Sequence, residues 1–253
     1  VAAKGLGVPV YKLLGGAKRS KVTPYCSIMQ GTSQGRSWTQ LQDITYEALA
    51  KGIESGYRAF KIQALFYETC TDRELAELMH RCREMVGTDK DLMLDVGYRW
   101  RHASDAIRAM RRMEQEELFF VETPIHTDNI DGYAKLAAAI DTPVAMGEFL
   151  SSRFEFMEYV TRDAVGVLQP DLGRAGGLTE SRRIAHIARD RGLMVVPHGW
   201  KTMIAVATLI HYSASLDNCP YIEYPDPDLL LAPILPKELA GPIPELVDGH
   251  FAL

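Results

Sequence analysis

Three carboxylates stand at regular intervals along the chain, each at the end of a short apolar run. They are Asp95 in "LDV", Glu122 in "VETP" and Glu148 in "GE", separated by 27 and 26 residues. Each one alone is typical of a strand end that meets solvent. Together they predict a shared site, because neighbouring carboxylates repel one another unless a cation lies among them. Hard oxygen ligands with room left for substrate and water favour Mg²⁺ over zinc or copper.

An aspartate and a histidine continue the same spacing further along the chain. Asp171 lies in "QPDLGRAGG" and His198 in "VPHGW", again 27 residues apart. An aspartate that accepts one ring N–H orients an imidazole and keeps it basic, so the other nitrogen can take a proton from substrate. We therefore interpret Asp171 and His198 as a dyad with His198 as the base.

The segments that must position these residues are predicted to alternate between strand and helix. Eight runs rich in β-branched and aromatic residues are predicted strands, at 21–28, 59–63, 91–96, 118–122, 143–148, 164–171, 193–198 and 221–224. Amphipathic patterns between them predict helices that include 73–87, 104–115, 132–140 and 179–192. Eight such units are typical of an α/β fold of the TIM-type (β/α)8 barrel class, whose functional residues lie at the carboxyl ends of the strands. A doubly wound open sheet is the alternative.

Composition and charge exclude several other classes of protein. The 253 residues are 47% hydrophobic and 24% charged with a net charge of −5, which is typical of a globular protein with a large core. Without a dense Lys/Arg block we expect no nucleic-acid partner, and without a long apolar run we expect no membrane partner. The four cysteines form no C-x-x-C pair, which predicts a protein of the reducing cytoplasm.

Seven polar residues at the predicted strand ends, taken in order, resemble the site of the enolase superfamily and, within it, the mandelate racemase subgroup. They are Lys61, Asp95, Glu122, Glu148, Asp171, His198 and Glu223. In that superfamily a Lys or His base works beside Mg²⁺ that stabilises an ene-diolate. The resemblance implies one Mg²⁺ held by the three consecutive carboxylates, stabilisation of the intermediate by Lys61, and a hydrogen bond from Glu223 to the substrate carboxylate. We also expect a homo-oligomer.

Two positions depart from the family pattern. The segment "FKIQ" keeps the first lysine of the family's Lys-x-Lys pair as Lys61, but the second is replaced by Gln63. A neutral amide cannot abstract a proton, so we expect Gln63 to bind substrate without acting as a second base. The family often has Asn two residues after the first metal ligand, where this chain has Gly97. The contact made by that Asn is either lost or supplied by Tyr98 or Arg99.

The two ends of the chain also resemble family segments. Residues 1–20 are similar to the linker that leads from the N-terminal capping domain into the barrel, and residues 236–253 to the segment that returns toward the cap. We therefore expect residues 21–235 to form a barrel without its capping domain. Since the cap carries much of the substrate specificity in the family, the identity of the substrate lies largely outside this sequence.

These residues predict carbanion chemistry at a carbon next to a carboxylate. His198 would remove the α-proton and hand it to a β-hydroxyl leaving on the same side, a reaction that needs no second base. We therefore expect an acid-sugar dehydratase that produces a 2-keto-3-deoxy sugar acid, with Lys61, Gln63 and Glu223 contacting the substrate. The alternatives are a racemase, epimerase or cycloisomerase of the same superfamily, or a metal-binding barrel without turnover.

Overall fold

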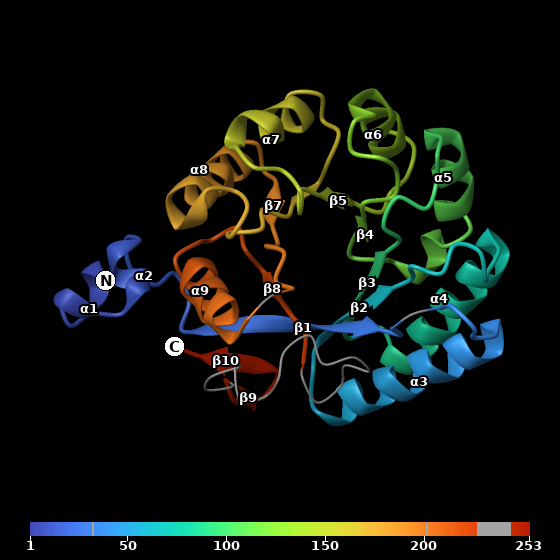
Figure 1. The fold of residues 1–253 in the computed structure, drawn as a ribbon, viewed down its shortest axis with the longest axis horizontal. Helices are drawn as coiled ribbons and strands as arrows, with labels where there is room; N and C mark the ends of the chain where they lie inside the picture. Colours follow the sequence, from blue (N-terminus) through green and yellow to red (C-terminus); the bar gives the residue numbers. More distant parts are fainter. Residues whose placement is uncertain (32, 201, 227–243) are drawn as a thin grey trace.

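Parallel strands form the wall of a barrel and helices surround it (Figure 1). The computed structural model describes residues 1–31, 33–200, 202–226 and 244–253. The strands are β1 (Lys21–Met29), β2 (Ala59–Gln63), β3 (Asp91–Asp95), β4 (Val121–Glu122), β5 (Val144–Met146), β6 (Val167–Leu168), β7 (Met194–Val195), β8 (Tyr221–Tyr224), β9 (Leu246–Val247) and β10 (His250–Ala252). The helices are α1 (Ala2–Gly5), α2 (Val10–Leu13), α3 (Trp38–Glu54), α4 (Asp72–Val86), α5 (Ala103–Met110), η1 (Glu114–Glu116), α6 (Ile130–Ala137), α7 (Arg153–Val160), α8 (Gly177–Asp190) and α9 (Met203–Ala214).

The first eight strands follow one another around the barrel in chain order. β8 pairs with β1, and parallel pairing then continues from β1 through to β7. Among the described residues no ladder joins β7 to β8, but the Val195 N–H donates to the Asn218 carbonyl at 2.9 Å. A doubly wound sheet would reverse its strand order at a switch point. The order observed confirms the predicted barrel and excludes that alternative.

Four of the strands are shorter than predicted. The segments 118–122, 143–148, 164–171 and 193–198 contain only the two- or three-residue strands β4 to β7. Backbone hydrogen bonds continue beyond these short strands, for example from Gln169 N to Met146 O (2.9 Å) and from Val196 N to Leu168 O (3.0 Å). Regular pairing then stops near Pro170 and Pro197, because proline has no N–H to donate to a neighbouring strand.

The helices lie where the amphipathic patterns predicted them, with some shorter ends. The helices predicted at 104–115 and 132–140 end earlier than predicted, at Met110 and Ala137. Three helices begin with a capping box, in which a serine or threonine and a Glu or Gln three residues later satisfy each other's backbone N–H groups. These pairs are Ser37–Gln40 in α3, Thr71–Glu74 in α4 and Ser152–Glu155 in α7.

An apolar plug inside the barrel determines where the polar residues stand. One buried residue from each of the first seven strand segments contributes to it: Tyr25, Ala59, Met93, Phe120, Ala145, Val167 and Val196. Side chains two positions apart share a face of a strand. Two positions on from four of these plug residues stand Lys61, Asp95, Glu122 and His198. The plug therefore forms the floor on which the next inward-facing layer, the candidate site, is built.

Glu148 breaks this alternation, because it follows Ala145 by three positions. Gly147 between them has φ of +132°, a conformation that side-chain-bearing residues rarely adopt, and a Cβ there would lie 2.4 Å from Cε1 of Phe156 and 3.2 Å from the backbone N of Gln169. The glycine changes the phase of the strand and lets Glu148 join the site.

Gly147→Ala should destabilise the protein because of this crowding and the strained backbone. We expect the free energy of unfolding to fall by about 2 kcal/mol or more, measured by urea denaturation. Gly5→Ala is the matched control, since a Cβ there would meet no atom within 4 Å. Equal stability of the two variants would show that residue 147 tolerates a side chain.

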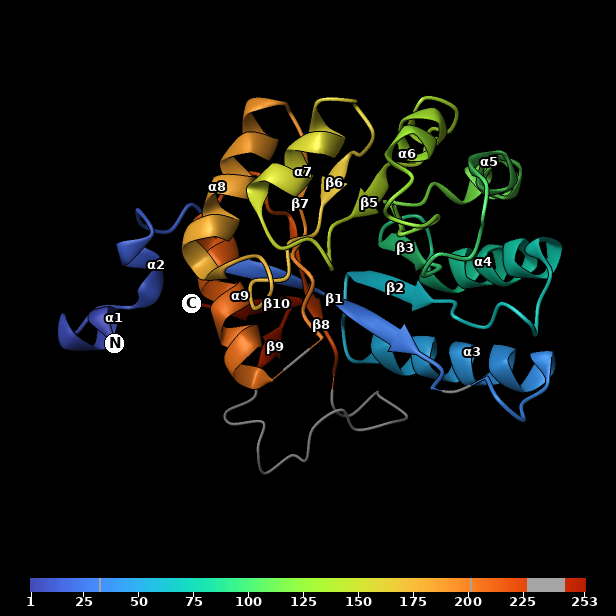
Figure 2. The ribbon, with the colours of Figure 1, turned by 45° about the horizontal axis from the view of Figure 1, so that its top comes forward.

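The ends of the chain pack against the barrel at different places. β10 pairs antiparallel with the beginning of β1, Lys21 opposite Ala252, and continues into β9. Of the segment 236–253, which was predicted to return toward the cap, residues 244–253 are described and contain β9 and β10, while 236–243 lie outside the described residues. Figure 2 shows α1 and α2 outside the ring beside α9, where the Tyr11 and His211 rings lie 5.7 Å apart. None of the helices in the described part of the chain has the length and apolar character needed to cross a membrane.

Candidate active site

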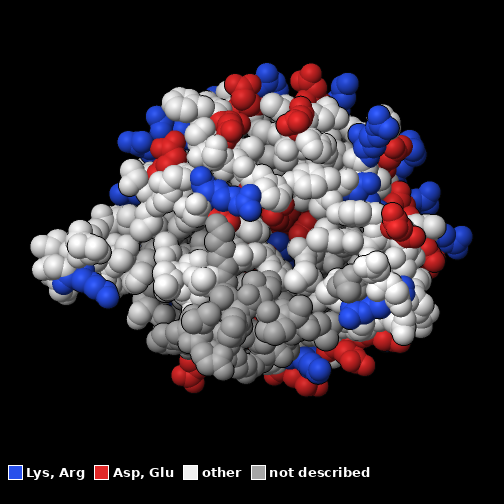
Figure 3. All heavy atoms as spheres, viewed as in Figure 1, with Lys and Arg blue, Asp and Glu red and all other residues white. Residues whose placement is uncertain are grey.

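The carboxyl ends of the barrel strands bring the predicted site residues to one mouth. Figure 3 shows a hollow near the middle of this face, with acidic side chains gathered at its floor. β2 supplies Lys61 and Gln63, β3 supplies Asp95, and β4 supplies Glu122. The other predicted residues, Glu148, Asp171, His198 and Glu223, come from β8 and from the segments that follow β5, β6 and β7.

Lys61 is the buried cation at the centre of the site. Its Nζ lies 2.7 Å from Oε2 of Glu122, 2.7 Å from Oε1 of Glu223 and 3.9 Å from Oδ2 of Asp95, and its side chain is 1% exposed. Burial alone would lower the pKa of Lys61, but the charges of Glu122 and Glu223 outweigh it and raise the pKa well above its usual value. The ammonium therefore stays charged and compensates carboxylates on three strands.

Glu223 is a carboxylate surrounded by hydrogen-bond donors. Its Oε1 accepts from the Trp200 indole (2.7 Å) and the Ser27 hydroxyl (3.2 Å) in addition to Lys61, and its Oε2 accepts from the backbone N–H of Gly199 (2.8 Å). Burial raises the pKa of Glu223, but the charges of Lys61 and His198 and the hydrogen bonds from Lys61 and Gly199 lower it to about 2. Glu223 is therefore an ionised acceptor at neutral pH.

The predicted contact between His198 and Asp171 is present. Nδ1 of His198 lies 3.0 Å from Oδ2 of Asp171, whose Oδ1 accepts from the Gly173 N–H at 2.8 Å. On the other side of the ring, Nε2 lies 3.3 Å from Oε2 of Glu148. Burial lowers the pKa of His198, but the hydrogen bond to Asp171 and the charge of Glu223 raise it above its usual value. The ring is thus held by Asp171 and presents Nε2 to the carboxylate cluster.

The three carboxylates predicted as metal ligands influence one another strongly. Burial and the charge of Glu122 raise the pKa of Asp95 to about 8 and that of Glu148 to about 7. Oε1 of Glu122 is buried with no hydrogen-bond partner in the part of the chain that the structure describes. A buried, partnerless oxygen among mutually repelling carboxylates is a donor set that suits a hard dication.

The side chains of the three predicted metal ligands do not surround one point. Among the described residues no three His, Cys, Asp or Glu groups are arranged to hold a metal ion. The reason is local pairing, because Glu122 contacts Lys61 and Glu148 contacts His198. The three carboxylates agree with a metal site in type, and Asp95 and Glu122 agree with it in burial as well. Their assignment as ligands therefore stays a prediction.

Gln63 stands at the edge of the carboxylate cluster. Its Nε2 donates to Oδ2 of Asp95 at 3.1 Å, while its Oε1 is buried without a partner among the described residues. Gln63 therefore orients Asp95 and keeps one acceptor for a hydroxyl. A chain that carried a lysine here would place a second cation against Asp95.

The space beside position 97 is filled by other side chains. A Cβ on Gly97 would lie 2.5 Å from Leu65 and 2.8 Å from the Tyr67 hydroxyl, which donates to the Gly97 carbonyl. Arg99 is turned away, since its Nε binds Asp72 at 3.0 Å. Tyr98 remains near the site, where burial and the charge of Glu148 raise its pKa. Tyr67 was not predicted to lie near the site, because it stands in a loop without a motif; the charges of Asp95 and Glu148 act on its hydroxyl.

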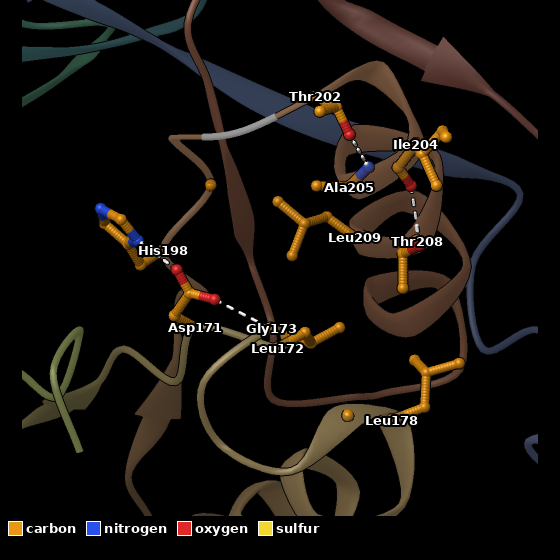
Figure 4. A pocket seen from close by; sticks show the side chains of 12 residues that line it. Asp171, Leu172, Gly173, Leu178, His198, Thr202, Ile204, Ala205, Thr208 and Leu209 are labelled. Carbon is orange, nitrogen blue, oxygen red and sulfur yellow. Dashed lines mark hydrogen bonds and ion pairs between the residues drawn. The ribbon is translucent and has the colours of Figure 1, made fainter. Parts of the chain in front are cut away.

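A separate, mostly apolar cavity lies behind the dyad. It has a volume of about 310 Å³ and is lined by Leu172, Leu178, Ala205 and Leu209 beside Asp171. Figure 4 shows the Asp171 carboxylate between the cavity and the imidazole of His198, and this imidazole points away from the cavity. The cavity's polar side chains are those of the dyad, Asp171 and His198, and of Thr202 and Thr208, and most of its lining is apolar.

The fold and the site together define a parallel (β/α)8 barrel that carries a buried lysine, a carboxylate cluster and a His–Asp pair at one mouth. The description "Enolase C-terminal domain-like" is that of the family model matched by residues 45–253. The chain therefore belongs to this family, within the enolase superfamily.

Relatives within the family include dehydratases and a racemase candidate. The chain is 33% identical over 250 residues to the L-talarate/galactarate dehydratase of Salmonella typhimurium, covering 98% of this chain and 56% of that protein. A crystal structure of a racemase candidate is 35% identical with a TM-score of 0.92, covering 100% of this chain and 66% of that one. The L-talarate dehydratase of Polaromonas sp. JS666, solved with Mg and L-glucarate, is 27% identical with a TM-score of 0.79, covering 99% and 63%. The chain thus spans about half the length of the curated relative.

Proposed function

We propose that the protein is a Mg²⁺-dependent acid-sugar dehydratase, a hydro-lyase that converts a sugar acid into a 2-keto-3-deoxy sugar acid. The observation that carries this proposal is the asymmetry of the site. His198, partly buried and oriented by Asp171, faces the carboxylate cluster, whereas the position of a second base holds the amide of Gln63. The names of the Salmonella and Polaromonas relatives, both sugar-acid dehydratases, support the same reaction.

The proposed metal ligands are Asp95, Glu122 and Glu148. Mg²⁺ bound there would supply a Lewis acid that polarises the substrate carboxylate. The partnerless Oε1 of Glu122 and the raised pKa values of Asp95 and Glu148 support this assignment.

The chain's own residues supply the proton transfers. Nε2 of His198 takes the α-proton, and the Lys61 ammonium offsets the negative charge that then develops on the substrate. The protonated His198 returns the same proton to the departing β-hydroxyl, which leaves as water. The resulting enol tautomerises to the keto acid, so no second base and no oxidant is needed.

Two further residues complete the proposed substrate contacts. The free Oε1 of Gln63 is placed to accept a hydrogen bond from a substrate hydroxyl. The resemblance implied a contact between Glu223 and the substrate carboxylate. Because Glu223 is fully buried and already accepts from several donors, we propose instead that it acts through Lys61.

The direct test is a screen of sugar acids with the full-length protein and Mg²⁺, in which the products are analysed for a 2-keto acid. We expect a 2-keto-3-deoxy product from at least one sugar acid, no epimerised starting material, and no product after chelation of the metal. Efficient epimerisation by the natural protein would favour the racemase or epimerase alternative. Metal binding without any α-proton exchange would favour a barrel without turnover.

Gln63→Lys tests the asymmetry itself. If Gln63 is the reason that protons are transferred on only one face of the substrate, a lysine at this position should transfer protons on the other face. We then expect slow deuterium incorporation with inversion at the α-carbon, detected by NMR in D₂O. Gln63→Met is the matched control, because it has similar length but no titratable group. Inversion by the Met variant or by the natural protein would show that another group transfers a proton on the second face of the substrate.

A further inference from the structure

The segment that carries the base also holds Glu223 from two consecutive positions. Directly after His198, the Gly199 N–H donates to Oε2 of Glu223 at 2.8 Å, and the Trp200 indole N–H donates to Oε1 at 2.7 Å. Glu223 is fully buried, and its Oε1 also lies 2.7 Å from Nζ of Lys61. The two oxygens of one carboxylate are thus each tied to the loop that follows β7.

Position 199 is built for this approach. A Cβ on Gly199 would lie 2.8 Å from the Glu223 carbonyl oxygen, 3.1 Å from the Glu223 Cβ and 2.8 Å from Cδ1 of Leu209. Only a residue without a side chain lets the backbone reach β8 so closely. The close approach brings Trp200 to the distance at which its indole can donate to the same carboxylate.

We propose that Trp200 is a positioning residue that fixes Glu223, and through Glu223 the ammonium of Lys61, in the arrangement needed for turnover. The proposal rests on the proposed function for its catalytic readout but not for its geometry. Lys61 is shared between Glu122 and Glu223 at equal distances of 2.7 Å. If the indole donor is lost, Oε1 of Glu223 can shift. The Lys61 ammonium is then held less firmly by Glu223 and moves toward Glu122.

Trp200 is suited to this task because the residue is partly buried and its ring is rigid. An indole offers one N–H donor and no acceptor, so it can only donate to the carboxylate. Hydrogen bonds to a charged group are about twice as strong as neutral ones. The same contact also couples the loop that carries His198 to the lysine on β2, so the base and the cation are positioned together.

The test is Trp200→Phe in the full-length protein, since phenylalanine keeps an aromatic ring but has no N–H. We expect kcat to fall by roughly 10- to 100-fold, the size expected for one charged hydrogen bond, with KM changed by less than about threefold. Trp38→Phe is the matched control, because Trp38 is not one of the predicted site residues: it begins α3 and packs on Phe66 with ring centroids 5.5 Å apart. It should leave kcat and KM unchanged.

Two further measurements keep the outcome decisive. A crystal structure of Trp200→Phe should show the Glu223–Lys61 contact lengthened beyond hydrogen-bond distance, and an unmoved pair would overturn the proposal whether or not the protein is a dehydratase. Trp200→His retains a ring N–H and should recover part of the lost kcat. If Trp200→Phe does not fold, a folded Trp200→His with kcat near that of the natural protein supports the proposal, and one with kcat as low as background contradicts it.

Discussion

His198→Asn should abolish α-proton exchange while leaving metal binding nearly intact. General acid and base groups contribute about 10² to 10⁴-fold to a rate, and this site offers one imidazole that is both oriented by Asp171 and directed at the carboxylates. Asparagine is similar in size and can still donate to Asp171, so the surroundings should remain folded. The loss should appear as an absence of deuterium in recovered sugar acid after incubation in D₂O.

The control for this variant is His186→Asn, the same chemical change on α8. His186 lies on a surrounding helix and is not one of the predicted site residues. Exchange by His186→Asn should equal that of the natural protein. If His198→Asn exchanged the α-proton at an unchanged rate, His198 would not be the base and the mechanism proposed above would fail.

Lys61→Met should cause the largest loss of stability among the site variants. Methionine is similar in length but carries no charge, so Glu122 and Glu223 would be left buried without their cation. Removing one partner of a buried ion pair costs about 3 to 5 kcal/mol. For a domain of this size we expect the melting temperature to fall by roughly 6 to 20 °C, measured by thermal unfolding without added metal.

A second substitution identifies the cause of that loss. In Lys61→Met combined with Glu223→Gln, one of the uncompensated charges is also removed, and part of the lost stability should return. Lys135→Met, on the exposed face of α6, controls for the removal of a lysine as such. A Lys61→Met variant as stable as Lys135→Met would show that the buried carboxylates do not depend on the ammonium.

One repeating rule of the sequence predicted which of these residues lie near one another. Whole βα units separate Asp95, Glu122, Asp171 and His198 along the chain. Because the strands follow one another in order around the barrel, residues with this spacing lie close together at one mouth. The same rule predicted eight strands and the helices between them.

The rest depended on contacts that no spacing encodes. Glu148 faces His198, and Glu122 is drawn to Lys61, because buried charges pair with the nearest opposite charge. The sequence predicted a metal among these carboxylates but did not predict these pairings. Tyr67 and Trp200 approach the site from loops, where the direction of a side chain follows from local backbone conformation. Strands β6 and β7 are shorter than predicted because Pro170 and Pro197 have no N–H with which to continue the pairing.

We proposed that His198, oriented by Asp171, removes a proton next to a carboxylate with the help of Mg²⁺ held by Asp95, Glu122 and Glu148. The most direct measurement is proton NMR of sugar acids incubated with the full-length protein in D₂O, with Mg²⁺ and with a chelator. We predict that the α-proton signal of at least one sugar acid is lost with Mg²⁺ as a 2-keto-3-deoxy acid forms, and that it persists with the chelator. Exchange that proceeds equally well without metal, or no exchange with any sugar acid, would contradict the account.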